Sequence, residues 1–578
     1  MRRERSFYEQ RFASVYQSLN DRQRQAVDQI EGPVMVLAGP GTGKTHLLAA
    51  RIGRILLHTD AQAHHILCLT FTDAAVQNMR LRLLDFIGPD AQRVHINTFH
   101  SFCNGIIQDN LGFFGRRDLQ PLTELERVDF VRQLLDELPP DHLLRRGRSD
   151  RHFYEGHLTG LFRQMKQQDW TPGQLEKAVR DYLNDLPNRP EYIYQISRGT
   201  FRKGDLKTAK LQEQQERMER LLAAARLFAP YRQKLRRAGR YDYEDMILWV
   251  LDAFQRNEAL LRRYQEQYLY ILVDEYQDTN GAQNELLRQL VAYWDNPNLC
   301  IVGDEDQSIF EFQGARLQNL LDFYRDYREH IRLVVLEDNY RSTQAILDTG
   351  ARLIEYNRLR ATELLEDAQS GKALRAARPD RRASAVRPDW TTYRNRYQEA
   401  VAVVGQVERL IRDGLPPGEI ALLFARHEQA RLISSLLEKK GIPYFAKRDV
   451  DLLQHPLFGQ LIQLLRYLQT ELERPYSGEH LLFENLHAAF WQLDLQDLAA
   501  LALYRAKKAA RSRPHWRDML TDAGLLPART LLHPARLPAG GARRAPPTAG
   551  ASRPSGSRPE RATSGRASAR PPPRGRSS

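Results

Sequence analysis

The chain has few cysteines and no long hydrophobic run. Its three cysteines, Cys68, Cys103 and Cys300, lie in or beside apolar segments without CxxC spacing, which is typical of reduced core thiols and argues against disulfides or a zinc site. No segment approaches the ~18 apolar residues that cross a bilayer, and the N-terminal "MRRERSFYEQRF" lacks the apolar stretch of a signal peptide. The histidines do not cluster with acids or thiols, so we expect no transition metal. We therefore expect a cytoplasmic protein without a membrane partner.

Positive charge is concentrated in the C-terminal tail. The net charge of the 578 residues is +13, but residues 527–578 hold eleven arginines, one glutamate and no lysine. The tail therefore carries +10, and residues 1–526 carry +3. Any basic groove in the folded body must come from local placement. Residues 526–578 are rich in Arg, Pro, Ala, Ser and Gly and cannot bury enough apolar surface to offset the entropy of ordering, so we predict that they are disordered.

Strands alternate with helices in the first part of the chain. A helical segment, "LNDRQRQAV", is followed by the apolar strand at residues 34–37, the glycine loop "AGPGTGKT" and a helix that begins near Lys44. The segment "HHILCLTFT" and the segment "RVHINTFHSFC" continue this pattern, and residues 73–86 form a helix between them. The alternation predicts an α/β fold with a parallel sheet flanked by helices.

The pattern also divides the chain into domains. We predict a first α/β domain over residues 1–110 and 231–330, interrupted at 111–230 by an all-helical insertion with a helix start at Thr171 and Pro172. An incomplete second α/β domain follows over 331–470, with strands in "HIRLVVLEDNYRS" and "EIALLF" and helices at 428–440 and 455–472. Residues 471–525 read as the start of another helical subdomain.

The glycine loop predicts a site for ATP and Mg²⁺. Backbone N–H groups of its first part would cradle phosphate oxygens, Lys44 would reach the β- and γ-phosphates, and the Thr45 hydroxyl would bind Mg²⁺. A loop of this type usually begins with glycine, but Ala38 is small enough for the position. The loop residues ahead of the lysine are Ala38, Gly39, Pro40, Gly41, Thr42 and Gly43.

The stretch "ILVDEYQDTN" places acids at the end of a buried strand. Neighbouring negative charges repel one another, so a cation is expected there. We predict that Asp274 holds Mg²⁺ and that Glu275 polarises the water that attacks the γ-phosphate. Taken alone, an acidic strand end is equally often ordinary helix capping, and it is the upstream loop that favours the catalytic interpretation.

Seven segments in order, the glycine loop among them, resemble the motifs of the UvrD/Rep-like superfamily 1 DNA helicases. Besides the glycine loop and "VDEYQDTN", they are "LNDRQRQAV", "LTFTDAAVQNMRLRL" with "INTFHSF", "VGDEDQSIFEFQGA" and "LEDNYRS". The resemblance covers residues 15–520 and implies two RecA-like motor domains. It implies that adenine is contacted by Gln23, His46 and Tyr340. It also implies that Gln307 senses the γ-phosphate and that Arg341 acts as an arginine finger. It implies DNA contacts by Phe71, Thr98, His100, Ser101, Phe310 and Phe312.

Simpler interpretations of these residues remain open. Each phenylalanine could belong to the core, His100 could cap a helix, and Tyr340 could pack in an interface. Many members of the family have arginine where this chain has His46, and basic residues are common beside Phe312, where Glu311 and Gln313 stand here. Adenine stacking and affinity for single strands could therefore be weaker.

The resemblance implies an ATP-dependent DNA helicase. Its expected partners are single-stranded DNA and single-strand/duplex junctions, along which it would move 3′ to 5′ in repair or recombination. The family's last DNA motif and last arginine motif do not follow residue 520, and the tail has the composition of out-of-frame translation of a GC-rich gene. We therefore expect C-terminal truncation, with a genuine basic arm as the competing interpretation. The alternative function is an ATP- and DNA-binding remnant that does not unwind. A kinase-like phosphotransferase would not explain the phenylalanine motif or Arg341.

Overall fold

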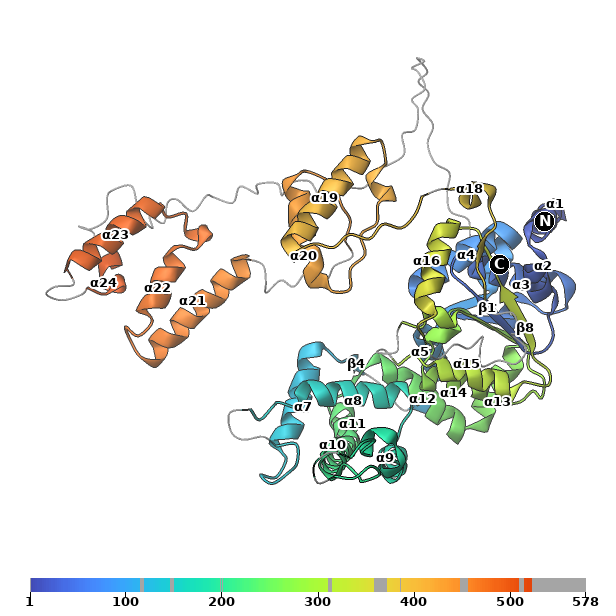
Figure 1. Cartoon of the computed structure of the whole chain (residues 1–578), viewed down its shortest axis with the longest axis horizontal. Helices are drawn as coiled ribbons and strands as arrows, with labels where there is room; N and C mark the ends of the chain where they lie inside the picture. Colours follow the sequence, from blue (N-terminus) through green and yellow to red (C-terminus); the bar gives the residue numbers. More distant parts are fainter. Residues whose placement is uncertain are drawn as a thin grey trace, which may run out of the picture. The chain divides into compact units, whose positions relative to one another are not determined.

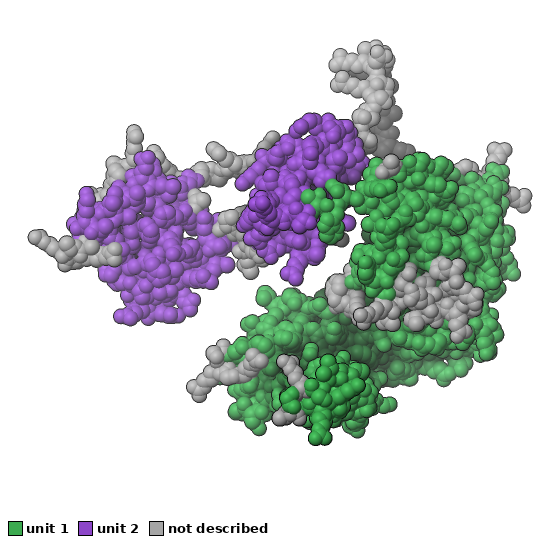
Figure 2. Space-filling view, viewed as in Figure 1, with its two compact units in different colours: residues 1–391 green, residues 392–578 purple. Residues whose placement is uncertain are grey.

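The computed structural model divides the chain into two compact units. Residues 1–391 form the first unit and residues 392–578 the second (Figure 2). The structure describes residues 2–114, 119–145, 150–197, 199, 201–309, 314–357, 372–384, 386–446, 456–508 and 514–521. The predicted disordered tail at 526–578 lies outside these ranges.

A six-stranded parallel sheet organises the first unit (Figure 1). Its strands are β1 (Val34–Ala38), β2 (Ile66–Thr70), β3 (His95–Thr98), β6 (Tyr270–Val273), β7 (Leu299–Gly303) and β8 (Arg332–Leu336), in the order β3-β2-β6-β7-β1-β8. The central strands are continuous aliphatic runs, as expected for a parallel sheet that is buried on both faces. Because β7 separates β1 from β6, the loop that follows β7 emerges between the glycine loop and the acidic strand end.

Successive residues of β1 enter two different cores. Met35 and Leu37 join the core formed with helices α5 (Phe99–Asp109), α12 (Tyr243–Arg256), α13 (Glu258–Gln267), α14 (Gly281–Val291) and α15 (Leu317–Asp326). Val34 and Val36 join the opposite core, formed with α1 (Arg2–Ser18), α2 (Asp21–Asp28), α3 (Lys44–His58) and α4 (Asp73–Ile87). The first unit thus contains the predicted α/β architecture of a sheet between two helical layers.

The predicted helical insertion has its own core. It contains α6 (Leu111–Phe114), α7 (Glu124–Asp136), α8 (Glu155–Gln167), α9 (Pro172–Asp185), α10 (Thr208–Arg226) and α11 (Phe228–Arg237). Helix α9 begins as predicted, with Pro172 in its first turn and Thr171 as its cap, where the Thr171 side chain accepts a hydrogen bond from Gln174 N. Two-residue strands β4 (Gln120–Pro121) and β5 (Arg240–Tyr241) pair where the insertion joins the sheet domain.

Two strands of the expected second α/β domain differ in the structure. Strand β8 lies in the first sheet, where Val34 is in register with Arg332 and Ala38 with Leu336. Its apolar sequence identified a strand but not the neighbour with which it would pair. Residues 419–424 are not a strand: Ile420 and Leu422 pack inward and Leu423 is 96% exposed, but no described residue forms a ladder with them.

Short elements complete the first unit after β8. They are β9 (Asp338–Asn339), α16 (Gln344–Ile354), β10 (Arg375–Ala376) and α18 (Pro379–Arg382), and β9 pairs in parallel with β10. The second unit holds α19 (Arg396–Arg412) and α20 (His427–Lys439), which share a small core. It also holds α21 (Pro456–Glu473), α22 (Glu479–Leu486), α23 (Leu495–Lys508) and α24 (Trp516–Thr521), so the helices predicted near 428–440, 455–472 and in 471–525 are present.

The cysteines behave as the sequence predicts. Cys68, Cys103 and Cys300 are free and buried, and burial raises the pKa of each thiol. Within the described ranges, no helix combines the length and the apolar character needed to span a bilayer.

Candidate nucleotide site

The glycine loop connects β1 directly to α3 and adopts a conformation that glycine permits. Gly41 and Gly43 have φ values of 72° and 87°, in the left-handed region that side chains rarely enter. The Thr42 hydroxyl, which is buried, donates to Gly39 O at 2.8 Å and so closes the loop on itself. Gly43 precedes the first turn of α3, whose N–H groups have no partners within the helix. The loop therefore offers a positive helix terminus to an anion.

Three carboxylates meet one ammonium at the end of β6. Lys44 Nζ donates to Glu275 Oε2 at 2.6 Å. Burial, followed by the neighbouring Glu275, raises the pKa of Asp274 to about 7, and the same two causes raise the pKa of Asp278 to about 6. Glu275 has a φ of 50°, a left-handed conformation that is strained for a non-glycine residue. Such strain is typical of functional positions.

The donors at this edge fit a magnesium ion. Carboxylate and hydroxyl oxygens are the ligands that Mg²⁺ prefers, and Asp274 and Thr45 supply them here. Oδ1 of Asp278 is buried without a hydrogen-bond partner, and the Lys44 ammonium alone does not balance the three carboxylates. A divalent cation would remove this imbalance, because an opposite charge stabilises the ionised form of a buried acid.

A chain of hydrogen bonds connects the acidic strand end with the loop after β7. Gln277 Nε2 donates to Glu275 Oε2 at 2.9 Å, and Gln277 Oε1 accepts from Asp304 N at 2.9 Å. The Gln307 amide in turn donates to the Asp304 carboxylate. Gln307, the predicted phosphate sensor, therefore belongs to the network that contains the predicted base.

Gln23 and Tyr340 contact the glycine loop at Thr42 and Gly41. Gln23 is buried and donates through Nε2 to Thr42 O at 2.9 Å. Asn20, which caps α2, accepts a hydrogen bond from Gln23 N and donates to the Tyr340 hydroxyl at 2.9 Å. Backbone N–H of Tyr340 donates to Gly41 O at 2.9 Å. Two of the three residues predicted to contact adenine are thus held together against the loop.

Arg341 is brought to the same loop by its neighbour Asn339. The Asn339 side chain donates to Pro40 O and accepts from Arg341 N at 2.9 Å. A Cβ added at Gly41 would lie 2.8 Å from the Cβ of Arg341, so only glycine permits this approach. Lys44 and Arg341 therefore share one loop, with the arginine side chain exposed.

Two protein-family models match the chain. The UvrD/REP helicase N-terminal domain matches residues 19–328, which is more than half of the sequence, and the UvrD-like helicase C-terminal domain matches residues 334–474. The chain belongs to the UvrD/REP helicase family.

Two curated relatives are consistent with membership in this family. The ATP-dependent DNA helicase PcrA of Staphylococcus epidermidis is 29% identical over 431 residues, which are 75% of this chain and 51% of the relative. PcrA of Staphylococcus aureus is 28% identical over 426 residues, which are 74% of this chain and 50% of the relative. The chain spans about half the length of the curated relatives it matches.

One predicted nucleotide contact of this UvrD/REP family member is directed elsewhere. The His46 ring packs edge-on against Phe86 of α4, with ring centroids 5.1 Å apart. Burial and then the Arg82 charge lower the pKa of His46, so the imidazole is neutral at pH 7. The residue follows the loop in sequence, but in the structure its side chain belongs to the packing between α3 and α4.

The predicted DNA contacts are only partly described. Thr98 and Ser101 cap α5: Thr98 Oγ1 accepts from Ser101 N at 3.2 Å, and Ser101 Oγ accepts from Thr98 N at 2.8 Å. His100 stands edge-on to the exposed Tyr243, and burial lowers its pKa. Phe71 is partly buried in the loop between β2 and α4. Phe310 and Phe312, with Glu311 and Gln313, lie outside the described residues.

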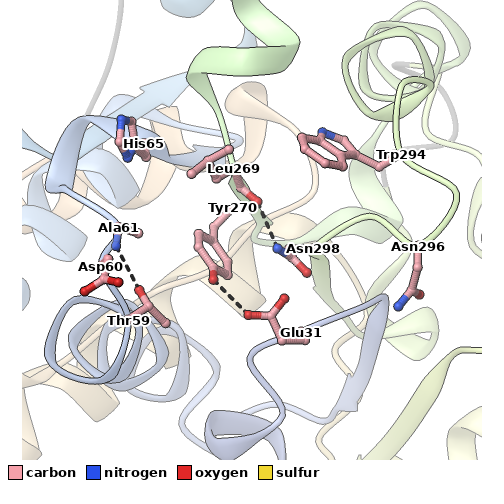
Figure 3. A pocket seen from close by; sticks show the side chains of 10 residues that line it. All are labelled: Glu31, Thr59, Asp60, Ala61, His65, Leu269, Tyr270, Trp294, Asn296 and Asn298. Carbon is pink, nitrogen blue, oxygen red and sulfur yellow. Dashed lines mark hydrogen bonds between the residues drawn. The ribbon is translucent and has the colours of Figure 1, made fainter.

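A pocket of about 390 Å³ opens at the opposite edge of the sheet (Figure 3). Its lining residues precede strands rather than follow them, as Tyr270 begins β6 and Asn298 precedes β7. The Tyr270 hydroxyl donates to Glu31 Oε1 at 3.0 Å and Asn298 Nδ2 to Leu269 O at 3.2 Å, so these polar groups satisfy one another. Ligands of open α/β sheets bind at the carboxyl ends of strands, where the glycine loop lies.

Sequence reasoning missed three residues of the nucleotide site. Gln277 and Asn339 stand inside the motifs "VDEYQDTN" and "LEDNYRS", so their position beside predicted site residues was an available signal. Asn20 caps α2 and also holds Tyr340, and it too stands inside a motif, "LNDRQRQAV", three residues before the predicted contact Gln23.

Proposed function

We propose that this chain is an ATP-driven motor on DNA that moves 3′ to 5′ along a single strand and separates duplexes during repair or recombination. The relatives that support this proposal are described as ATP-dependent DNA helicases. The observation that carries it is the gathering of Lys44, Glu275 and Arg341 around one glycine loop. A loop that only bound phosphate would need neither the strained acid nor the arginine.

The side chains divide the work of ATP hydrolysis. Lys44 neutralises charge on the β- and γ-phosphates, and Glu275 accepts a proton from the attacking water. Gln307 donates a hydrogen bond to the γ-phosphate and reports its presence to the DNA-contacting residues that follow it. Arg341 stabilises the charge that develops in the transition state, an effect worth about 10³- to 10⁵-fold in rate in related enzymes. Asp274 and Thr45 would hold Mg²⁺, which when bound would neutralise further charge on the phosphates.

Contacts with DNA would come from the loops at the same edge of the sheet. Thr98, His100 and Ser101 would approach phosphate oxygens, which position a strand without reading its sequence. Phe71, Phe310 and Phe312 would stack on unpaired bases, each stack contributing about 1 to 3 kcal/mol whatever the base. Release of counterions from the phosphates would make DNA affinity fall as salt rises.

The test is ATP hydrolysis by the whole chain with and without a single-stranded oligonucleotide. We expect stimulation by the oligonucleotide and weaker half-saturation as NaCl increases from 50 to 200 mM, about tenfold or more if several phosphates are contacted. The same hydrolysis rate in the presence and absence of DNA would contradict a motor.

A second candidate is a module that binds ATP and DNA without unwinding. It is favoured by residues 419–424, where apolar residues alternate but no described strand pairs with them. Displacement of a labelled strand from a duplex with a 3′ single-stranded tail distinguishes the two. A motor displaces the strand only with ATP, whereas a module binds the same substrate tightly and leaves it paired. A duplex with a 5′ tail is the control for polarity.

A further inference from the structure

A buried lysine lies beside the nucleotide site in a segment that none of the family motifs contains. Lys372, only 2% exposed in its side chain, contacts the turn formed by Asp304 and the 3-10 helix η6 (Glu305–Gln307). Its Nζ donates to Asp304 Oδ1 and lies 2.7 Å from Asp306 Oδ2 and 3.3 Å from Glu305 Oε2. We call Asp304–Gln307 the coupling turn.

The coupling turn carries Gln307, so Lys372 and the predicted phosphate sensor meet on one carboxylate. Asp304 accepts from Lys372 on Oδ1 and from the Gln307 amide on Oδ2. Its backbone N–H donates to Gln277, which donates to Glu275. Unbroken hydrogen bonds therefore lead from Lys372 both to the sensor and to the predicted base.

The residues that follow Lys372 cover the glycine loop. Leu374 lies so close to Gly39 that a Cβ added there would be 2.6 Å from Leu374 Cδ2. Arg375 and Ala376 form β10, which pairs with β9 next to Arg341. Residues 372–376, the covering segment, thus contact the coupling turn at one end and, at the other, strand β9, which precedes Arg341.

Electrostatics make the lysine necessary for the turn. Three consecutive carboxylates, in Asp304, Glu305 and Asp306, lie together, and Glu305 is buried with neither oxygen hydrogen-bonded. Although burial opposes it, the three acids raise the pKa of Lys372, which therefore stays charged at pH 7. Without that charge Asp304 would lose the cation that holds its carboxylate in place, and the oxygen that orients the Gln307 amide would be displaced.

We propose that Lys372 is a positioning residue for ATP hydrolysis: it fixes Asp304, which sets the direction of the Gln307 amide and so the response of the site to a γ-phosphate. The proposal rests on the proposed ATPase function. Under this proposal, the orientation of the Gln307 amide depends both on the γ-phosphate and on the placement of the covering segment.

The test is a mutant cycle between Lys372→Met and Gln307→Ala in the full chain. We expect Lys372→Met to lower kcat about 10- to 100-fold, as misplacement of a catalytic group does, with KM for ATP changed less than about threefold. In the Gln307→Ala background the same change should cost less than about threefold, because the group through which Lys372 acts is absent. Equal losses in both backgrounds would overturn the proposal.

Two further variants separate positioning from folding. Lys372→Arg keeps the charge and should recover at least half of the rate, and Arg381→Met is the matched control, since Arg381 is 45% exposed, pairs with Asp380 and lies outside the covering segment. The control should keep the rate within about twofold of the unchanged chain. Failure of Lys372→Arg to restore any activity, or an equal loss in Arg381→Met, would count against a specific role of the lysine charge.

A binding measurement tests the positioning role of Lys372 even if the unchanged chain does not turn over ATP. Titration with a fluorescent non-hydrolysable triphosphate and with the matching diphosphate gives the preference for a γ-phosphate. Lys372→Met should reduce that preference about tenfold and leave diphosphate affinity unaltered, and an unaltered preference would overturn the proposal. If the unchanged chain binds neither nucleotide, the proposed function fails first and the role of Lys372 fails with it.

Discussion

Two of the clusters in the first unit that place a lysine among acids differ in how completely their own groups satisfy one another. In the first, Lys166 of α8 contacts Asp242 Oδ2 at 2.7 Å and Asp245 Oδ2 at 2.9 Å. The two aspartates also cap α12 reciprocally, each accepting from the other's backbone N–H. The second cluster has Lys44 against the acids at the end of β6.

The first cluster satisfies its own groups. Burial raises the pKa of Asp242 to about 6, whereas for Asp245 the Lys166 ammonium and hydrogen bonds outweigh burial and lower the pKa. Both carboxylates contact the Lys166 ammonium, and each accepts a backbone hydrogen bond. The cluster joins the helical insertion to the sheet domain, and it needs nothing from solution.

The second cluster is incomplete without a ligand. Lys44 contacts Glu275, while Asp274 and Asp278 have pKa values raised towards neutrality and Asp278 keeps a buried oxygen without a partner. The contrast teaches that a buried lysine alone does not indicate function. A deficit of positive charge at the carboxyl ends of strands does, because a bound cation and its nucleotide would remove it.

The largest expected effect comes from the incomplete cluster. Glu275→Gln should lower ATP turnover about 10³-fold, since the amide cannot accept the proton, and should preserve nucleotide affinity. Steady-state hydrolysis and equilibrium binding of labelled ATP measure the two quantities. Glu258→Gln is the control, because Glu258 is 75% exposed and pairs only along its own helix with Arg262. Turnover that persists in Glu275→Gln would place the base elsewhere.

A substitution in the cluster around Lys166 should lower the stability of the fold rather than ATP turnover. Lys166→Met leaves two buried aspartates without their cation, and loss of one partner of a buried ion pair costs about 3–5 kcal/mol. Urea unfolding followed by tryptophan fluorescence measures the change in unfolding free energy. Lys210→Met is the control: Lys210 is exposed and should alter stability by less than about 0.5 kcal/mol. If both variants unfold at the same urea concentration, the ion pairs of Lys166 do not contribute to the free energy of unfolding.

The pH dependence of stability provides a further test of the incomplete cluster. The pKa of Asp274 is raised from 3.8 to about 7 in the folded state, so its contribution to stability is complete below pH 3.8 and is lost as pH rises through 7. Asp274→Asn removes this titration. Between pH 5.5 and 8 the melting temperature of the unchanged chain should therefore fall by about 2 °C relative to the variant.

Magnesium sharpens this pH prediction. A cation bound by Asp274 favours the ionised carboxylate, so MgADP should raise the melting temperature of the unchanged chain more at pH 8 than at pH 5.5. Differential scanning fluorimetry at the two pH values measures both effects. A ligand-induced shift that does not depend on pH would argue against Asp274 as the magnesium ligand.

Sequence patterns predicted individual helices and strands better than they predicted which of these elements lie side by side. The strand ahead of the glycine loop, the helix that starts at Thr171 and the acids after β6 follow from local rules, because each depends on residues a few positions apart. Strand β8 and residues 419–424 show the limit, since a strand is completed only by a partner strand, which local rules do not identify. Lys372 shows the same limit for the site: it reaches Asp304 across 68 residues, with no motif around it.

The smallest expected effect concerns His46, which follows the loop in sequence but faces away from the acidic cluster. Because its ring packs against Phe86, His46→Ala should lower stability by about 1 kcal/mol through lost packing and change ATP affinity less than about twofold. His46→Phe preserves an aromatic ring and should restore most of the stability. Urea unfolding and nucleotide titration of both variants provide the measurements. A loss of ATP affinity that exceeds tenfold in His46→Ala, with stability unchanged, would return this residue to the adenine contact that the family resemblance implied.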